Sequence, residues 1–461
     1  MHATQTALLI VALLPPVAAA QVTIPDLFPF PNGSGVLETR NTSGSGAIDT
    51  SGPFFQSLGT NGRSCFSCHR PDQAWSISAE NVALRFKLTQ GSDPIFRTVD
   101  GSNCDHNIDV STVHGRAQAY SLLLSYGVIR VALPVPSGAE YQVVSVANPY
   151  GCSDTATIST YRRPLPSTNL KFLSAVMWDG RESTAPSTAK IGNPADLAGD
   201  LAHQAMDAVS GHAQAAAPIP ASVQQQIVEF ESGLYTAQAY DYNAGFLNGY
   251  GATGGPQAAA AQQFFIGIND PLGGNPTGGA FTPAIFNLFT AWLKPEGFFG
   301  ANARSAIQRG EEVFNTKPIN ITGVAGLNDT LGLPVIAGNC GTCHSSPNAG
   351  NHSVSLPVNI GVADLTNSLG VGYLPVITLK NNTTGALVQT TDPGRALITG
   401  KWADIGKFKG PVLRGLAARA PYFHNGSAAT LSDVVDFYNS RFGVGITPRE
   451  KQDLIAFLNA L

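Results

Sequence analysis

Two copies of the motif Cys-x-x-Cys-His constrain this chain more than any other feature of its sequence. They span Cys65–His69 and Cys340–His344. Each is the attachment signature of a c-type haem. Two thiols three positions apart each add to a vinyl group of one porphyrin, and the adjacent imidazole serves as proximal ligand of the iron. Because the motifs lie in different halves of a chain with only six cysteines, the sequence predicts two covalently bound haem c groups.

Two other kinds of site use cysteines at this spacing. A structural zinc site would require the two pairs to converge from distant parts of the chain, and it would leave the His after each pair unexplained. A redox dithiol accounts for one copy and usually lies within a βαβ pattern. The haem interpretation explains both copies and both histidines, so we adopt it.

The first residues of the chain have the pattern of an export signal. An apolar run over residues 7–14 is followed by the small residues Ala18–Ala20. The run is too short to span a bilayer, and no later segment is long and apolar enough to do so. No Lys or Arg precedes the run, and a plain apolar terminus is the alternative. We predict a signal peptide over residues 1–20 and a periplasmic protein that does not span the membrane.

The remaining cysteines and the charge agree with export. Cys104 and Cys152 are left when the haem motifs have used the other four, and an oxidising compartment would allow them to form a disulfide. The formal net charge is −4, and only 13% of the residues are charged. Nothing in this balance suggests a nucleic acid or an anionic membrane surface as partner.

Helical patterning is present in both halves of the chain. Amphipathic periodicity indicates helices over residues 196–209, 221–239 and 304–314. At residues 447–461, a Thr at the N-cap and a Pro at the first helical position predict a terminal helix. The second half therefore has the order of a small cytochrome c, which is helix, haem motif, loop and terminal helix.

The segment between about residues 76 and 160 does not look helical throughout. Two β-like runs, residues 128–133 and 141–146, are joined by a stretch with two prolines and a glycine, and we predict a hairpin there. Cys104 and Cys152 bracket this hairpin, so we interpret the segment as an insertion that a disulfide fixes to the first haem domain.

Together these patterns predict a mainly α fold with two tandem cytochrome c-like haem domains, long loops and a small β-containing insertion in the first. The length of 461 residues allows such a division. The expected parts are a signal peptide (1–20), an extended N-terminal arm (21–50), an N-terminal haem domain (51–290) with the insertion (about 76–160), and a C-terminal cytochrome c domain (291–461).

Three further stretches resemble the bacterial dihaem cytochrome c peroxidases and their relative MauG. They are Met-Trp-Asp-Gly-Arg at 177–181, Phe-Lys-Gly-Pro-Val-Leu-Arg-Gly at 408–415 and Ala-Pro-Tyr-Phe-His-Asn-Gly at 420–426. With the haem motifs, the resemblance covers most of residues 45–75 and 160–461, and it leaves the insertion outside.

The resemblance implies that the two haems divide the work. The C-terminal haem at His344 would accept electrons, and the N-terminal haem at His69 would meet hydrogen peroxide. Trp178 corresponds to the tryptophan that lies between the haems and relays an electron. A buried aromatic side chain packed at the domain interface is the alternative. The electron donor would be a small periplasmic protein, either a cytochrome c or a cupredoxin.

Axial ligands are expected to make the haems unequal, because a six-coordinate haem transfers electrons whereas an open one binds peroxide. All three methionines lie in the N-terminal half, so the C-terminal domain offers no Met ligand. The peroxidases carry a Met ligand of the second haem at the position where this chain has Tyr438, as MauG-like enzymes do. Packing of Tyr438 against Phe437 is the alternative. His352 and His424 are the competing ligands, and the family pattern favours His424 near the haem rather than on it.

The distal side of the first haem departs from the family pattern. The peroxidases carry a distal His before the Trp-Asp-Gly-Arg stretch, but here no His occurs between His114 and His203. We expect an open site; His106 or His114 reaching in from the insertion is the alternative. Gln204 corresponds to the family's distal Gln, and His212 is the candidate acid or base where the family has Glu. A structural His on a helix is the alternative for His212.

The calcium ligands of the family correspond here to Arg163 and Arg419, whose positive charges oppose a bound cation, so calcium is doubtful as a cofactor. The expected function is a periplasmic dihaem oxidoreductase that activates hydrogen peroxide at the N-terminal haem with electrons relayed through the C-terminal haem. The alternatives are MauG-like oxidation of an organic or protein substrate and, in another class, a non-catalytic dihaem electron carrier.

Overall fold

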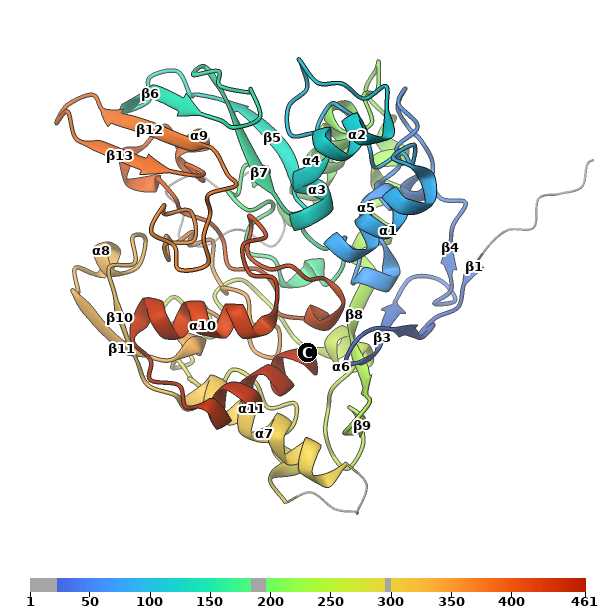
Figure 1. The fold of residues 1–461 in the computed structure, drawn as a ribbon. Helices are drawn as coiled ribbons and strands as arrows, with labels where there is room; N and C mark the ends of the chain where they lie inside the picture. The colour runs from blue at the N-terminus through green and yellow to red at the C-terminus, as the bar shows by residue number, and fades with distance from the viewer. Residues whose placement is uncertain (1–22, 184–195, 295–299) are drawn as a thin grey trace, which may run out of the picture.

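The structure, a computed structural model, describes residues 23–183, 196–294 and 300–461 (Figure 1). The predicted signal peptide over residues 1–20 lies outside these ranges. Within them, helices with their short 3-10 turns take up 31% of the residues and strands 17%. The fold is therefore mixed α/β, and the prediction of a mainly α fold is wrong in this respect. The long loops pair with one another as short strands, because backbone N–H and C=O groups that are removed from water need partners.

The helices are spread over the whole described part of the chain, and none of them is both long and apolar enough to cross a membrane. Their bounds are α1 Ala79–Thr89, α2 Val113–Ala119, α3 Ser121–Tyr126, α4 Leu197–Gly211, α5 Ala221–Ser232, α6 Pro256–Ala261, α7 Ala301–Thr316, α8 Asn328–Leu331, α9 Ala396–Thr399, α10 Leu431–Phe442 and α11 Pro448–Asn459.

Three of the four helices expected from the sequence are confirmed, as α4, α7 and α11. The helix expected over residues 221–239 is only half correct, because α5 ends at Ser232 and the chain continues as strand β8. Gly233 follows α5 as its C-cap, a position where glycine is common after a helix. The residues after it include Leu, Tyr and Thr, which favour a pleated, half-buried surface.

The strands form five small sheets within the described ranges, and every pairing in them is antiparallel. The sheet orders are β2-β3-β8-β9, β13-β12-β6, β1-β4, β10-β11 and β5-β7. The bounds are β1 Thr23–Ile24, β2 Phe30–Pro31, β3 Gly35–Asn41, β4 Ile48–Asp49, β5 Ile129–Pro134, β6 Tyr141–Ala147, β7 Thr157–Arg162, β8 Leu234–Asp241, β9 Gly245–Phe246, β10 Ile319–Thr322, β11 Val335–Gly338, β12 Val376–Asn381 and β13 Leu387–Thr390.

The predicted hairpin in the insertion is wrong. Its two runs are strands β5 and β6, but β5 pairs with β7 and β6 pairs with β12 from the C-terminal half. Strand β6 buries Tyr141 and Val146 in a cluster with Ile377 of β12, and this apolar contact outweighs the short local connection. The predicted disulfide between Cys104 and Cys152 is confirmed.

The N-terminal arm pairs as a strand with a later segment of the chain. Strand β3 pairs with β8 over seven residue positions, from Gly35 opposite Asp241 to Asn41 opposite Leu234. Figure 1 shows these strands side by side, blue against green. The arm thus lies against the segment that follows helix α5.

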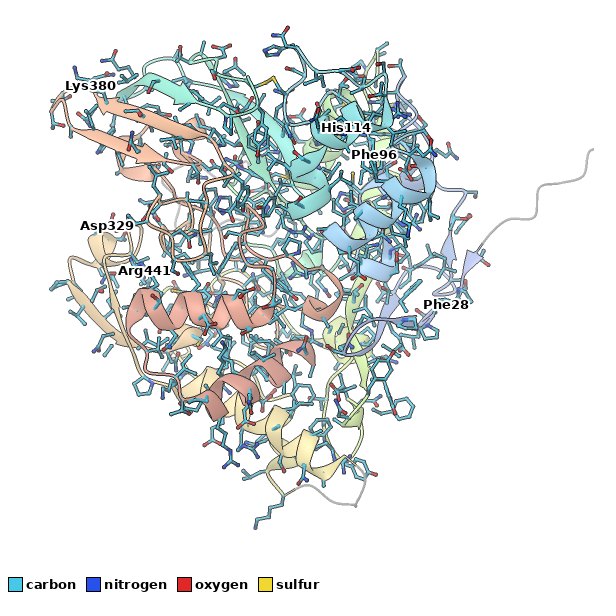
Figure 2. All side chains as sticks on the ribbon, viewed as in Figure 1. Phe28, Phe96, His114, Asp329, Lys380 and Arg441 are labelled. Atoms are coloured by element: carbon cyan, nitrogen blue, oxygen red, sulfur yellow. A yellow bond between two sulfur atoms is a disulfide. The ribbon has the colours of Figure 1, made fainter. Side chains whose placement is uncertain are left out.

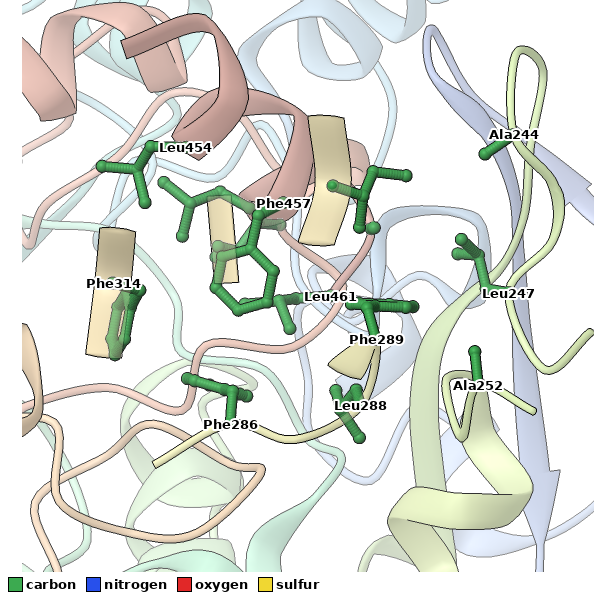
Figure 3. Packing of buried hydrophobic residues seen from close by; sticks show 14 of the residues in the cluster. Ala244, Leu247, Ala252, Phe286, Leu288, Phe289, Phe314, Leu454, Phe457 and Leu461 are labelled. Carbon is green, nitrogen blue, oxygen red and sulfur yellow. The ribbon is translucent and has the colours of Figure 1, made fainter. Parts of the chain in front are cut away.

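The largest apolar cluster joins the C-terminal helices to residues from the middle of the chain. Figure 3 shows Phe286 and Phe314 facing Phe457 of α11. Helices α7 and α11 pack tightly at Gly310, where a Cβ atom would lie 2.0 Å from the carbonyl oxygen of Asp453. Only glycine allows this crossing. The cluster includes residues on both sides of position 290, and the division of the chain there stays a prediction.

Candidate haem centres

The two Cys-x-x-Cys-His motifs fold into the same local structure. Each begins with a 3-10 turn, at Cys65–Ser67 and at Cys340–Thr342, and in each the residue before the turn forms a capping box with its third residue. The backbone N–H of His69 donates to the carbonyl oxygen of Cys65 at 3.0 Å, and His344 donates to Cys340 at the same distance. One compact turn therefore holds both thiols and the imidazole of each motif.

Both motif histidines have the arrangement expected of an axial ligand. His69 Nδ1 lies 2.9 Å from the carbonyl oxygen of Trp75 and 3.0 Å from Ser167 Oγ, and His344 Nδ1 lies 2.5 Å from the carbonyl oxygen of Gly350. Burial lowers the pKa of His69 to about 4 and also lowers the pKa of His344. A neutral imidazole whose Nδ1–H is donated keeps a lone pair on Nε2, the atom that binds metal.

The four motif thiols do not suit a zinc site or a reactive dithiol. Burial raises the pKa of all four, to about 12 for Cys340 and about 11 for Cys343. Disulfide exchange needs a thiolate, so this burial disfavours a reactive dithiol. The two pairs also line separate cavities. These observations fit covalent attachment of one haem at each motif.

The first cavity has a volume of about 170 Å³ and lies beside His69. The predicted residues Trp178, Gln204 and His212 all line it, together with Met177. Gln204 lies inside helix α4 and His212 is its C-cap, so one helix places both side chains at the cavity. The structure thus brings the two candidate distal residues together.

A buried carboxylate from the insertion orients His212. The Nδ1 atom of His212 and the carboxylate of Asp100 form a short contact, and Arg63 contacts the other carboxylate oxygen. Burial alone would raise the pKa of Asp100, but His212 and Arg63 hold it below its ordinary value. An Asp that accepts from Nδ1 leaves Nε2 of His212 available to accept or donate a proton in the cavity.

The histidines of the insertion do not reach the first haem. The side chain of His106 is 57% exposed and contacts Asp105. His114 is exposed on helix α2, as Figure 2 shows. Neither residue lines the cavity. Among the described residues, His69 and His212 are the histidines that do.

The second cavity has a volume of about 220 Å³ and is lined by His344, Tyr438, His352 and His424. Tyr438 lies on α10, and burial raises the pKa of its hydroxyl. His352 is buried, and within the described chain its Nε2 atom has no hydrogen-bond partner. His424 stacks on Phe408 with ring centroids 3.8 Å apart. The Nε2 atom of His424 likewise has no hydrogen-bond partner within the described chain, so Tyr438, His352 and His424 all remain candidate ligands.

Five residues line both cavities, namely Arg163, Pro164, Trp178, Lys409 and Pro411. Trp178 is 8% exposed. Its indole Nε1–H donates to the carbonyl oxygen of Arg163 at 2.8 Å, and its own carbonyl oxygen accepts from Lys409 N at 2.9 Å. The indole ring is thus fixed in the wall that separates the two cavities.

The guanidinium of Arg163 occupies a cradle of backbone carbonyl oxygens. It donates to Tyr126 at 3.2 Å, to Gly127 at 3.3 Å, to Arg419 at 2.9 Å and, in a shorter contact, to Ile77. Burial lowers the pKa of Arg163 to about 9. Carbonyl oxygens of this kind are also the ligands that calcium prefers. Here a side-chain cation occupies them and links the insertion to the C-terminal half.

Lys409 offers a positive charge to both cavities. It is 6% exposed, and burial, together with the nearby Arg419, lowers its pKa to about 8. Among the described residues, no nearby acid counteracts this lowering. A buried cation needs a compensating anion, and the carboxylates of a haem in either cavity fit this requirement.

The sequence did not single out three polar side chains that line the first cavity, namely Asp100, Ser167 and Glu231. Asp100 lies 112 positions from His212 along the chain, and no local pattern links the two. Glu231 carried a signal, because it follows Ile227 at helical spacing on the apolar face of α5, where all three of Ile227, Val228 and Glu231 are buried. A buried acid on an otherwise apolar helix face is a candidate functional residue.

No family model matches the chain. It is 36% identical over 135 residues to the cytochrome-c peroxidase IdrP2 of Denitromonas iodatirespirans, which covers 27% of this chain and 36% of that protein. It is 28% identical over 123 residues to the cytochrome c551 peroxidase of Pseudomonas aeruginosa. This match covers 26% of this chain and 30% of that protein. The chain thus spans about a third of the length of these curated relatives.

Among solved structures, the chain is similar to a MauG-like protein associated with microbial copper homeostasis. The TM-score is 0.40 and the sequence identity 17%, and the match covers 89% of this chain and 85% of that chain. The chain accordingly shares partial homology with cytochrome c peroxidases and a loose overall similarity with a MauG-like structure.

Proposed function

Because this chain is related to the bacterial dihaem cytochrome c peroxidase and MauG-like family, we propose that it activates hydrogen peroxide at a haem on His69 with electrons supplied through a haem on His344. The observation that carries the proposal is the position of Trp178, which is fixed in the wall common to both cavities. An oxidisable ring there connects the two centres.

The two motifs would hold the haems through their cysteines and through His69 and His344, and the bound haems would supply the redox chemistry. The protein supplies the proton movement. His212 takes the proton from the near oxygen of peroxide through Nε2 and returns it to the far oxygen, while Asp100 holds the ring in place. The amide of Gln204, on the same helix, orients the peroxide by hydrogen bonding. Complete reduction to water consumes two electrons and two protons for each peroxide.

The wall between the cavities supports electron supply. The backbone of Arg163 and Lys409 holds Trp178 at its indole N–H and at its carbonyl oxygen. The buried ammonium of Lys409 compensates haem carboxylates on either side. We propose that electrons enter at the second haem from a small periplasmic cytochrome c or cupredoxin. The predicted export signal and the Cys104–Cys152 disulfide support a periplasmic location.

A specific observation favours a MauG-like oxidase as second candidate. Tyr438 lines the second cavity, and the C-terminal half contains no Met. A phenolate ligand favours the ferric and higher oxidation states of iron over the ferrous state. Such a second haem would help to store oxidising equivalents from peroxide and use them on an organic or protein substrate.

Stopped-flow spectroscopy with peroxide distinguishes the candidates. The purified dihaem protein is mixed with peroxide in the presence and in the absence of a reduced donor cytochrome. Rapid donor oxidation supports the peroxidase, and a long-lived oxidised form without donor turnover supports the MauG-like oxidase. Two low-spin haems that do not react with peroxide would contradict both and would indicate an electron carrier.

A separate variant tests which residue is the axial ligand of the second haem. Tyr438→Phe removes the hydroxyl and keeps the ring, so the spectrum of the His344 haem should change while that of the His69 haem stays the same. An unchanged spectrum would exclude Tyr438 as a ligand. His352→Ala, which removes the competing ligand, would then be expected to change the spectrum of the His344 haem.

A further inference from the structure

A methionine thioether lines the first cavity, directly before Trp178 in the chain. Met177 lines this cavity together with Gln204 and His212. The chain has three methionines, at positions 1, 177 and 206. Met206 lies on helix α4, where it packs against a separate apolar cluster and lines neither cavity. Among the described residues, Met177 is therefore the methionine that lies where the proposed function places peroxide.

The local backbone and an apolar wall hold the thioether in place. Met177 has a φ angle of 68°, in the left-handed region that residues other than glycine rarely adopt, and its carbonyl oxygen accepts from the backbone N–H of Gly180 at 3.3 Å. Its side chain packs in an apolar cluster with Val176 and Leu201, and both of these residues also line the cavity. A strained residue of this kind persists where its surroundings fix it, and such residues gather at functional sites.

The two cavities differ in the oxidisable side chains that line them. Apart from the motif cysteines, which would be bonded to the haem, the readily oxidised side chains of the first cavity are Met177 and Trp178 within the described ranges. An indole gives up one electron at a time, whereas a thioether takes up an oxygen atom and becomes a sulfoxide. The second cavity has Tyr422 and Tyr438 in its described lining and no methionine. An acceptor for an oxygen atom is thus found at the first cavity.

We propose that Met177 is a modification site, at which peroxide in the first cavity oxidises the thioether to the sulfoxide when no electrons arrive through Trp178. This inference rests on the proposed reaction of peroxide at the His69 haem. A lone pair of the sulfur forms a bond to the near oxygen of peroxide while the O–O bond breaks. The proton on the near oxygen moves to the far oxygen, which leaves as water. The sulfur loses two electrons and the peroxide gains two, so the step needs no other oxidant or reductant.

The residues proposed to cleave peroxide serve this step as well. His212, held by Asp100, carries the proton from the near to the far oxygen, as it does when a donor supplies the electrons. Electrons delivered through Trp178 compete with the thioether for the same peroxide, so a supply of donor protects Met177. The sulfoxide is polar where the thioether is apolar. Each oxidised molecule therefore carries a stable chemical mark of peroxide activation without electron supply.

Peptide mass spectrometry of the full dihaem protein tests the proposal. The ferric protein receives one equivalent of hydrogen peroxide, with or without an excess of reduced cytochrome c, and the peptides of Met177 and Met206 are compared for added oxygen. Met206 is the matched control, because both side chains are half-buried and only Met177 of the two lines the cavity. Cys65→Ala/Cys68→Ala removes the first haem and His212→Ala removes the proton carrier. Both variants separate reaction in the cavity from reaction with peroxide in bulk solution.

Peroxide held in the cavity meets the thioether as an intramolecular partner, so without donor we expect Met177 to be oxidised at least about tenfold faster than Met206. Reduced cytochrome c should lower the oxidation of Met177 by a similar factor, and both variants should lower it toward the level of Met206. Equal oxidation of the two methionines in the wild-type protein would overturn the proposal. Oxidation of Met177 that is as fast in His212→Ala, which keeps both haem motifs, would overturn it as well.

Donor oxidation, followed in the same samples, separates this inference from the proposed function. Rapid oxidation of cytochrome c, together with a Met177 that stays a thioether when the donor is left out, would refute the modification and leave the peroxidase function standing. A Met177 sulfoxide that forms in a protein unable to oxidise the donor would refute the donor-driven function and leave the modification standing.

Discussion

The two haem-binding motifs share one local fold and differ in almost everything around it. Both form a capped 3-10 turn, and in both the imidazole Nδ1 has an acceptor. Around His69 lie the carbonyl oxygen of Trp75 and the hydroxyl of Ser167, and the same cavity is lined by Gln204 and by His212, which contacts Asp100. Around His344 lie a backbone carbonyl and Tyr438.

The comparison shows which parts of a haem site a motif specifies. Five consecutive residues fix the turn that presents both thiols and one imidazole. Side chains from distant segments, such as Asp100 from the insertion and Gln204 from α4, complete the lining of the first cavity. We therefore expect peroxide chemistry at the first site and electron supply at the second.

Removing one haem at a time should have the largest effect. Replacing Cys65 and Cys68 by Ala should abolish the reaction with peroxide, because the reactive centre is lost. Replacing Cys340 and Cys343 by Ala should leave the reaction with peroxide and stop turnover with a donor. Haem content by the pyridine haemochrome assay and stopped-flow traces measure both results. Donor-driven turnover at the wild-type rate without the second haem would break the division of labour.

His212→Ala should slow peroxide cleavage by about 10²–10⁴-fold, the usual contribution of a general acid or base. Peroxide binding should be much less affected, which single-turnover kinetics at varied peroxide concentration can separate. His203→Ala is the matched control, since His203 lies on the same helix, is exposed and contacts Glu182. Asp100→Asn should give a smaller loss. If His212→Ala and His203→Ala react alike, His212 has only a structural role.

Trp178→Phe should slow electron transfer between the haems by roughly tenfold, or about 1.4 kcal/mol in the barrier. Phenylalanine fills most of the same space but is far harder to oxidise and cannot donate to Arg163. Trp292→Phe is the control, because Trp292 is fully buried in the C-terminal core away from both cavities. The rate is followed as reoxidation of the second haem after peroxide is added. Equal rates in the two variants would remove Trp178 from the path.

Chelation of divalent cations should have the smallest effect. The Arg163 guanidinium occupies the carbonyl cradle between the insertion and the C-terminal half, so EDTA is expected to leave both spectra and the peroxide reaction unchanged. Loss of activity that added calcium restores would show that a metal ion links the two sites after all.

The parts of this molecule that short patterns encode were predictable from its sequence. The haem motifs, helices α4, α7 and α11 and the Cys104–Cys152 disulfide all follow from residues close together in the chain or from cysteine chemistry. The predicted Gln204 and His212 both line the first cavity, and their roles stay predictions.

Long-range pairing was the part that the sequence did not reveal. Strand β6 pairs with β12, more than two hundred positions away, rather than with its neighbour β5. Asp100 reaches His212 across 112 positions of the chain, and only the three-dimensional arrangement brings them together. Register and pairing of short, half-polar strands depend on which apolar surfaces meet, and that is decided by the whole fold.

Electron paramagnetic resonance of the oxidised dihaem protein, recorded before and after addition of peroxide, tests the division of work between the two haems. We expect one high-spin ferric haem at His69 that changes at once with peroxide, and one low-spin haem at His344. Cys65→Ala/Cys68→Ala should lose the high-spin signal. Two low-spin haems, or a high-spin haem that disappears with Cys340→Ala/Cys343→Ala instead, would contradict the assignment of peroxide chemistry to the first site.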